Sequence, residues 1–162
     1  MTINLSNFKL PQQEDAVLSS TFSGVKIDLD VSTIKIGKSL NGLFYSYAGA
    51  NIYGLENWDT SSVITMQNIF NHCEKLVSLN GIENWDTSSV VNMLGAFNWT
   101  RLLTTIPVDD WDVSNVEYMS YMFKGDWKIT NLNLKKWDVR KVKTIQEFLG
   151  DNYYVQTDQL TE

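Results

Sequence analysis

The chain has 162 residues, of which 43% are hydrophobic and 20% are charged, and its formal net charge is −6. This length fits a single domain with a core of its own, and the composition is that of a folded protein rather than a disordered one. The acidic balance argues against general nucleic-acid binding, which needs a basic surface. The sequence has no run of about 18 apolar residues, so we expect no membrane-spanning helix.

Residues 1–28 take no part in the repeats that fill most of the chain. They contain Pro11 and a β-leaning run from Phe22 to Leu29. A stack of repeats exposes apolar surface at its ends, so we expect residues 1–28 to form an N-terminal cap. The first residues carry neither a basic region nor an apolar one, so no signal peptide is visible.

A unit of about 26 residues recurs through residues 29–149. A Trp-Asp pair marks each clear copy, with spacings of 27, 26 and 26 between Trp58, Trp85, Trp111 and Trp137. An earlier, degenerate copy starts at Leu29. Self-similarity at a fixed period indicates a repeat architecture, in which each unit buries its apolar face against its neighbours.

The first half of each unit predicts a helix. In the first clear copy, apolar residues fall at i, i+3, i+6 and i+7, namely Val63, Met66, Ile69 and Phe70. This spacing is one face of a helix of about two turns. The Asp that follows each Trp, as at Asp59, is expected to cap the start of that helix.

The second half of each unit carries regularly spaced Leu and Ile, as at Leu76, Leu79 and Ile82. This pattern predicts the short strand and turn of a leucine-rich repeat. The predicted fold class is therefore α/β: a leucine-rich-repeat-like solenoid of about five strand–helix coils with an N-terminal cap. We expect one domain over residues 1–162, with repeats at 29–149 and a C-terminal tail or cap at 150–162.

The repeat resembles that of the BspA-like leucine-rich-repeat surface proteins of bacteria. The motif Trp-Asp-Thr-Ser-x-Val-x-x-Met carries the likeness, together with Cys73 and the Leu positions after it, over residues 30–149. The resemblance implies a surface or secreted protein whose role is adhesion or protein binding. It implies no catalysis.

We interpret the most conspicuous repeated residues as scaffold. The Trp residues recur in step with the unit and are expected to stack between coils. The Asp residues are spread about one per coil, whereas a metal site needs several oxygens in one place. Nothing near Cys73 and His72 would activate the thiol. We therefore expect no catalytic residue, metal or cofactor.

Aromatic residues that interrupt the repeat form the first candidate binding surface. They follow the Phe of each unit, at Tyr45, Tyr47, His72, Trp99 and Trp127. Consecutive coils would place this loop side by side, so we expect a stripe of rings along one edge. The alternative is that these rings cover the rim of the core.

A basic stretch in the last repeat is the second candidate. It contains Lys135, Lys136, Arg140, Lys141 and Lys143. Such a cluster can recognise an anionic partner. The alternative is that these charges keep the end of the stack soluble and monomeric.

The predicted function is that of a non-enzymatic protein-binding or adhesion module of a bacterial surface or secreted repeat protein. Its partner would be a protein of a host surface or extracellular matrix, and the module would act as a monomer. The alternative is a cytoplasmic protein-binding inhibitor encoded by a phage or mobile element. The starting Met and the absence of a visible signal peptide favour that alternative.

Overall fold

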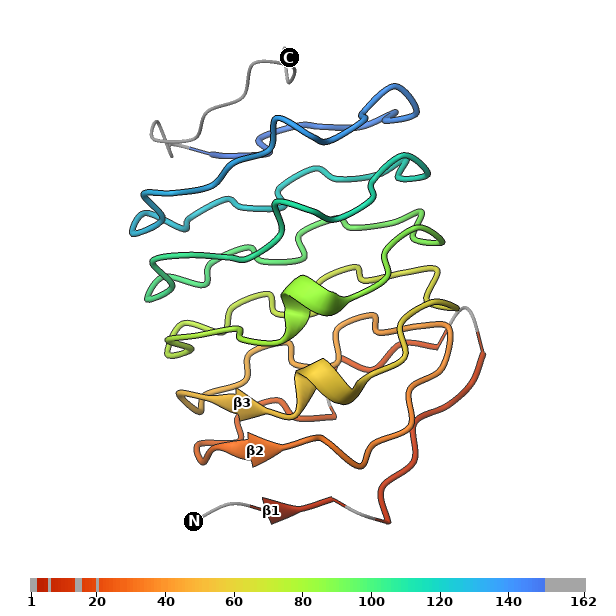
Figure 1. Cartoon of the computed structure of the whole chain (residues 1–162). Coiled ribbons are helices and arrows are strands. Elements are labelled where there is room, and N and C mark those ends of the chain that lie inside the picture. Colours follow the sequence, from red (N-terminus) through yellow and green to blue (C-terminus); the bar gives the residue numbers. More distant parts are fainter. Residues whose placement is uncertain (1–2, 6, 14–15, 20, 151–162) are drawn as a thin grey trace.

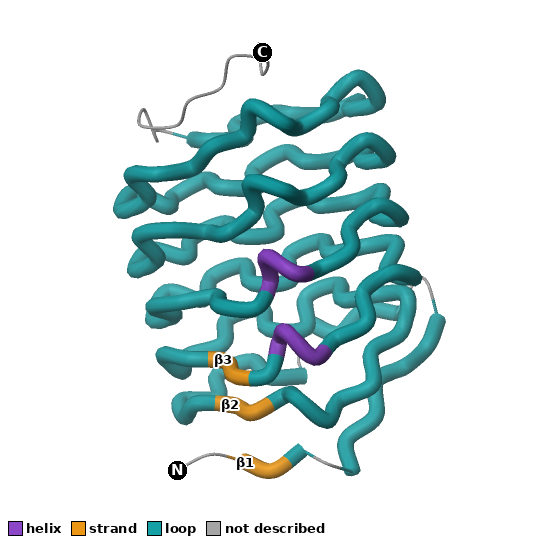
Figure 2. Tube along the Cα trace, in the orientation of Figure 1, coloured by secondary structure: helices purple, strands orange, loops and turns teal. Residues whose placement is uncertain are grey.

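The chain forms a stack of successive coils, and each coil packs on the preceding one (Figure 1). The computed structural model describes all residues except 1–2, 6, 14–15, 20 and 151–162. Turns and irregular segments make up most of each coil (Figure 2). No helix in the described part is long and apolar enough to cross a membrane.

The regular elements are few and short. Strands β1 (Ile3–Asn4), β2 (Leu29–Asp30) and β3 (Ile52–Tyr53) form a parallel sheet in the order β1-β2-β3. Two 3₁₀ helices, η1 (Leu55–Asn57) and η2 (Ile82–Asn84), lie one above the other in neighbouring coils (Figure 2). The two 3₁₀ helices occupy equivalent positions in successive repeats, since each ends at the Asn that precedes a repeat Trp.

The predicted α/β fold class, a leucine-rich-repeat-like solenoid of strand–helix coils, is wrong. The described residues contain no α-helix, and their named strands are only two residues long. The segment expected as a helix near Val63–Phe70 runs instead as a series of tight turns. Its Asn68 has a φ of 54°, whereas an α-helix needs φ near −63° at every residue.

Hydrogen bonds between coils explain why this segment is not helical. Every second N–H donates to a carbonyl of the next coil, as from Asn68 to Leu94 and from His72 to Asn98, both at 2.8 Å. The N–H groups in between close turns within the coil, as from Asn71 to Asn68 at 3.2 Å. In an α-helix, each of these N–H groups would instead donate to the carbonyl four residues earlier in the same segment. We call this side of the stack the turn wall; its segments are 40–47, 66–73, 93–100 and 119–126.

Two aromatic columns run along the stack inside the core. One consists of Phe rings, whose neighbouring centroids lie 5.4 to 5.7 Å apart. The other consists of the repeat Trp rings, with Trp85 lying 5.8 Å from Trp58 and 6.0 Å from Trp111. Each indole N–H in this column also donates to a backbone carbonyl of the preceding coil, as from Trp85 to Leu55 at 2.9 Å. The expected stacking is confirmed for Trp58, Trp85 and Trp111, whereas the ring of Trp137 packs against that of Phe123 at 6.3 Å.

The Asp residues that follow each Trp do not cap helices. Asp59 Oδ1 accepts the backbone N–H of Ser61 at 3.2 Å and its hydroxyl at 2.6 Å, a turn closed by the side chain. These hydrogen bonds lower the pKa of Asp59. Asp86, Asp112 and Asp138 likewise accept the backbone N–H of the residue two positions later in the chain. The Asp residues thus shape the corner that follows each Trp.

The N-terminal residues lie against the first repeat. Strand β1 pairs with β2, and the ring of Phe22 stacks on Phe44 at 5.3 Å. Phe22 thereby extends the Phe column by one ring towards the N-terminus. The expected C-terminal tail or cap, residues 150–162, lies outside the described residues from position 151 onward.

Replacing Trp85 by Ala should lower the free energy of unfolding by about 3–5 kcal/mol, because the change removes a buried ring and one hydrogen bond to the coil below. Urea unfolding followed by circular dichroism measures this loss. The control is Val77→Ala, since Val77 is 49% exposed and its truncation should cost less than about 0.5 kcal/mol. Equal losses in the two variants would contradict the role assigned to the Trp column.

Candidate functional site

Four ring side chains form a ladder along the turn wall. The centroid of Tyr45 lies 5.8 Å from that of His72, and His72 lies 5.7 Å from Trp99 with 6° between the ring planes. Trp127 follows at 5.8 Å from Trp99. We call these four residues the aromatic edge. The structure therefore brings together four of the five residues expected in the aromatic stripe.

Tyr47 does not belong to this surface, and its assignment to the stripe is wrong. Its side chain is 1% exposed, and its hydroxyl lies 2.8 Å from the carbonyl oxygens of both Ile27 and Asn51. Burial raises its pKa. Tyr47 stands three residues after Phe44, as Cys73 stands three residues after Phe70, and both positions face the core.

Cys73 is likewise a core residue. Its thiol donates to the carbonyl of Phe44 at 3.0 Å, and the side chain is fully buried. Burial raises the pKa of the thiol, which disfavours the reactive thiolate. Its neighbour His72 points away from it, onto the aromatic edge. Within the described residues, no group of three or more His, Cys, Asp or Glu side chains could hold a metal ion.

The backbone at the centre of the aromatic edge is left-handed. The φ angles are 59° at His72 and 63° at Trp99. Each residue is the third in a tight turn, a position that needs positive φ, and the equivalent residues in neighbouring coils are Ser46 and Gly125. Glycine adopts this conformation freely, whereas a bulky side chain costs about 1–2 kcal/mol. Asn68, Tyr121 and Glu147 also have positive φ, so left-handed residues recur along the turns of the stack.

Gly125 leaves room for the ring of Trp99. A Cβ atom at position 125 would lie 3.1 to 3.3 Å from three indole carbons of Trp99, so the ring rests directly on the backbone of the next coil. Trp127, two residues further on, then supplies the next ring of the ladder. Trp127 is 57% exposed, while Tyr45, His72 and Trp99 are half-buried. The ladder is therefore most open to solvent at its C-terminal end.

Arg101 completes the surface, and the sequence analysis missed it. Its guanidinium carbon lies 4.0 Å from the centroid of Trp99 and 5.1 Å from that of Trp127. Its terminal nitrogen lies 3.7 Å from the carboxylate of Glu74, one coil earlier. Glu74, Arg101 and Trp127 are spaced by 27 and 26 residues, so they form a column of equivalent positions, of which Trp127 also belongs to the aromatic edge. Aligning the repeats residue by residue would have found this column.

The basic stretch of the last repeat does not form an isolated cationic cluster. Lys143 pairs with Glu117 at 2.7 Å, and Lys136 pairs with Asp110, both in the preceding coil. Lys141 donates to the side chain of Asn115 at 2.5 Å. Arg140 binds Asp138 within its own corner, and Lys135 is exposed beside these residues. Lys136, Arg140, Lys141 and Lys143 therefore bind side chains of the same chain.

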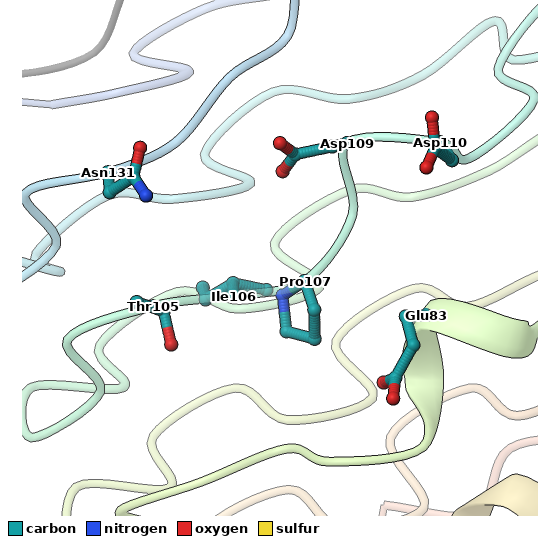
Figure 3. Close-up of a pocket in the computed structure, with 7 residues that line it drawn as sticks. All are labelled: Glu83, Thr105, Ile106, Pro107, Asp109, Asp110 and Asn131. Carbon is teal, nitrogen blue, oxygen red and sulfur yellow. The ribbon is translucent and has the colours of Figure 1, made fainter.

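A pocket of about 340 Å³ opens on a different part of the coils. Figure 3 shows the carboxylates of Glu83 and Asp109 beside it, with Pro107 between them. The full lining is Glu83, Thr105, Ile106, Pro107, Asp109, Asp110 and Asn131. Asp110 is held by Lys136, and Glu83 accepts the backbone N–H of Gly81 at 2.7 Å. Two of its three acidic side chains thus already bind groups of the chain itself.

The family comparison gives a different relationship from the one expected. The family described as "Mycoplasma protein of unknown function, DUF285" matches residues 38–161, which is more than half of the chain. The chain therefore belongs to the DUF285 family. The resemblance to BspA-like leucine-rich-repeat surface proteins is wrong, and the surface location inferred from it loses that support. No curated protein and no solved structure matches the chain.

The left-handed backbone of Trp99 can be tested by comparing Trp99→Gly with Trp99→Ala. Both variants lose the ring contacts, but only the Ala variant keeps a Cβ at positive φ. The Gly variant should be the more stable of the two by about 1 kcal/mol in urea unfolding.

The matched control is Tyr45, whose φ is not left-handed. There the order should reverse, with Tyr45→Gly less stable than Tyr45→Ala by about 0.5–1 kcal/mol. The same order at both positions would show that Trp99 carries no backbone strain.

Proposed function

We propose that this member of the DUF285 family is a non-enzymatic protein-binding module whose contact surface is the aromatic edge together with Arg101. The observation that carries this proposal is the continuous ladder of rings, Tyr45, His72, Trp99 and Trp127, on the outside of the turn wall. The same surface would serve an adhesin outside the cell or an inhibitor inside it.

The residue types of the edge support a role in protein recognition. Trp, Tyr and Arg are the residues that most often dominate the binding energy of protein interfaces. Trp127 leaves 57% of its surface exposed in the free protein. Covering the exposed part of such a ring contributes about 2–3 kcal/mol at about 25 cal/mol per Å² of apolar surface, before the entropy cost of association is subtracted.

The scaffold supports the proposal because it fixes the edge before a partner binds. The N–H groups of His72 and Trp99 donate to the next coil, each at 2.8 Å. The rings then restrict one another by stacking. Side chains that are already ordered lose little conformational entropy on binding, so more of the contact energy appears as affinity.

The alternative is that these rings merely cover the rim of the core. Tyr47 is an example of a ring that covers the core in this chain. It is 1% exposed, and its hydroxyl makes a hydrogen bond within the protein. Trp127 instead remains mostly exposed. The fold requires a left-handed residue at positions 72 and 99, but it does not require a ring there, because Ser46 and Gly125 fill the same position in other coils. The presence of rings where the fold does not require them supports the binding role.

Replacing Trp127 by Ala should weaken partner binding at least tenfold while changing the melting temperature little. The reason is that its exposed ring contributes contact area to a complex and little burial to the fold. Parallel capture experiments with wild type and Trp127→Ala, from host extract and from lysate of the source cells, measure the first effect. Thermal unfolding measures the second.

The control is Tyr53→Ala, which removes an aromatic ring that is 51% exposed on β3. It should capture the same proteins as the wild type. If Trp127→Ala also captures that same set, or if it unfolds at a much lower temperature, the aromatic edge is not the contact surface.

A further inference from the structure

Arg101 is held in place by rings rather than by hydrogen bonds. Its guanidinium group lies over Trp99 at 4.0 Å and beside Trp127 at 5.1 Å. Its Nε atom is buried and has no hydrogen-bond partner, and the nearest carboxylate, that of Glu74, is 3.7 Å away. A hydrogen bond requires a shorter separation, of about 2.7–3.2 Å. Within the described part of the chain, the Arg101 side chain therefore makes no hydrogen bond.

The chain's other arginine differs in this respect. Arg140 donates from Nε and Nη2 to the two oxygens of Asp138, at 2.8 and 2.5 Å. Arg101 carries the same planar set of five N–H donors, and 36% of its side chain is exposed. A guanidinium in cation–π contact with indole rings still has its N–H donors available for hydrogen bonds, because these donors lie at the edge of its plane. Such donors can bind a carboxylate through two parallel hydrogen bonds.

We infer that Arg101 is the docking point for a carboxylate of the protein partner. This inference rests on the proposed function and specifies the partner's chemistry. The partner presents an Asp or Glu side chain to Arg101, and apolar residues beside that acid cover Trp99 and Trp127. The recognised feature is thus a short acidic and apolar peptide segment.

Glu74 does not fill this role for Arg101. The pair is partly exposed, with 36% of the Arg101 side chain and 46% of the Glu74 side chain accessible, and its 3.7 Å separation is too long for a hydrogen bond. Exposed pairs of this kind contribute little to stability. An incoming carboxylate at hydrogen-bond distance replaces this contact, and the Glu74 charge opposes it. Removing the Glu74 charge should therefore strengthen binding, whereas removing the Arg101 charge should weaken it.

The test uses a display library of random 12-residue peptides, which are selected on the wild-type chain of 162 residues and then screened against Trp127→Ala. Peptides that require Trp127 should be enriched in Asp or Glu next to apolar residues. The affinity of the best such peptide is then measured by calorimetry for four variants of the protein.

Arg101→Gln should lose at least tenfold in affinity for this peptide, and Arg101→Lys should lose less, since it keeps the charge without the planar donors. Glu74→Gln should gain about two- to fivefold. Arg140→Gln also removes one guanidinium and its charge, but this guanidinium is already bound to Asp138. This variant should therefore change the affinity by less than twofold. Replacing the acidic residue of the peptide by Gln should weaken its binding to the wild-type protein but not to Arg101→Gln. This difference would show that the acidic residue interacts with Arg101.

Three outcomes contradict the inference. Peptides that require Trp127 but show no acidic enrichment would overturn it, as would an Arg101→Gln variant that is folded and binds within twofold of wild type. In both cases the aromatic edge remains a binding surface. A selection that yields no peptide requiring Trp127 would instead contradict the proposed function, and the role of Arg101 with it.

Discussion

The hydrogen bonds between successive coils of the turn wall are the constraint on which the rest of the structure depends. Because every second N–H donates to the next coil, as from His72 to Asn98, the segment cannot use those donors for an α-helix. The N–H groups in between close tight turns, and these turns require left-handed residues. The positions of His72 and Trp99 follow directly from this alternation, and so does the spacing of their rings.

The same stacking joins the core and the surface. Inside, the Phe and Trp columns repeat once per coil, and the indole N–H groups bind the coil below. Outside, the ladder from Tyr45 to Trp127 repeats with nearly the same centroid separation, from 5.7 to 5.8 Å. The inner columns hold the coils together, whereas the outer ladder has a side open to solvent. One repeat geometry thus accounts for both the stable scaffold and the surface we propose for binding.

The sequence predicted the repeat unit and the stacking of its Trp residues, because both depend only on spacing. It did not predict the backbone, since inward positions at i, i+3, i+6 and i+7 arise from a series of tight turns as well as from a helix. Gly42 and Gly95 occupy the left-handed position taken by Asn68, and glycines at that spacing argue against a helix. Tyr47 was misplaced because it was grouped with its aromatic neighbours rather than with Cys73. Arg101 was missed because its importance comes from the rings around it.

The turn-wall hydrogen bonds can be observed directly by NMR, through the scalar couplings that pass from an amide nitrogen to the carbonyl carbon of its acceptor. The structure predicts a coupling between the nitrogen of His72 and the carbonyl carbon of Asn98, which is in the next coil. A helix would instead couple His72 to Asn68, four residues earlier. Detection of the coupling to Asn98 supports the account, and detection of the coupling to Asn68 in its place would contradict it.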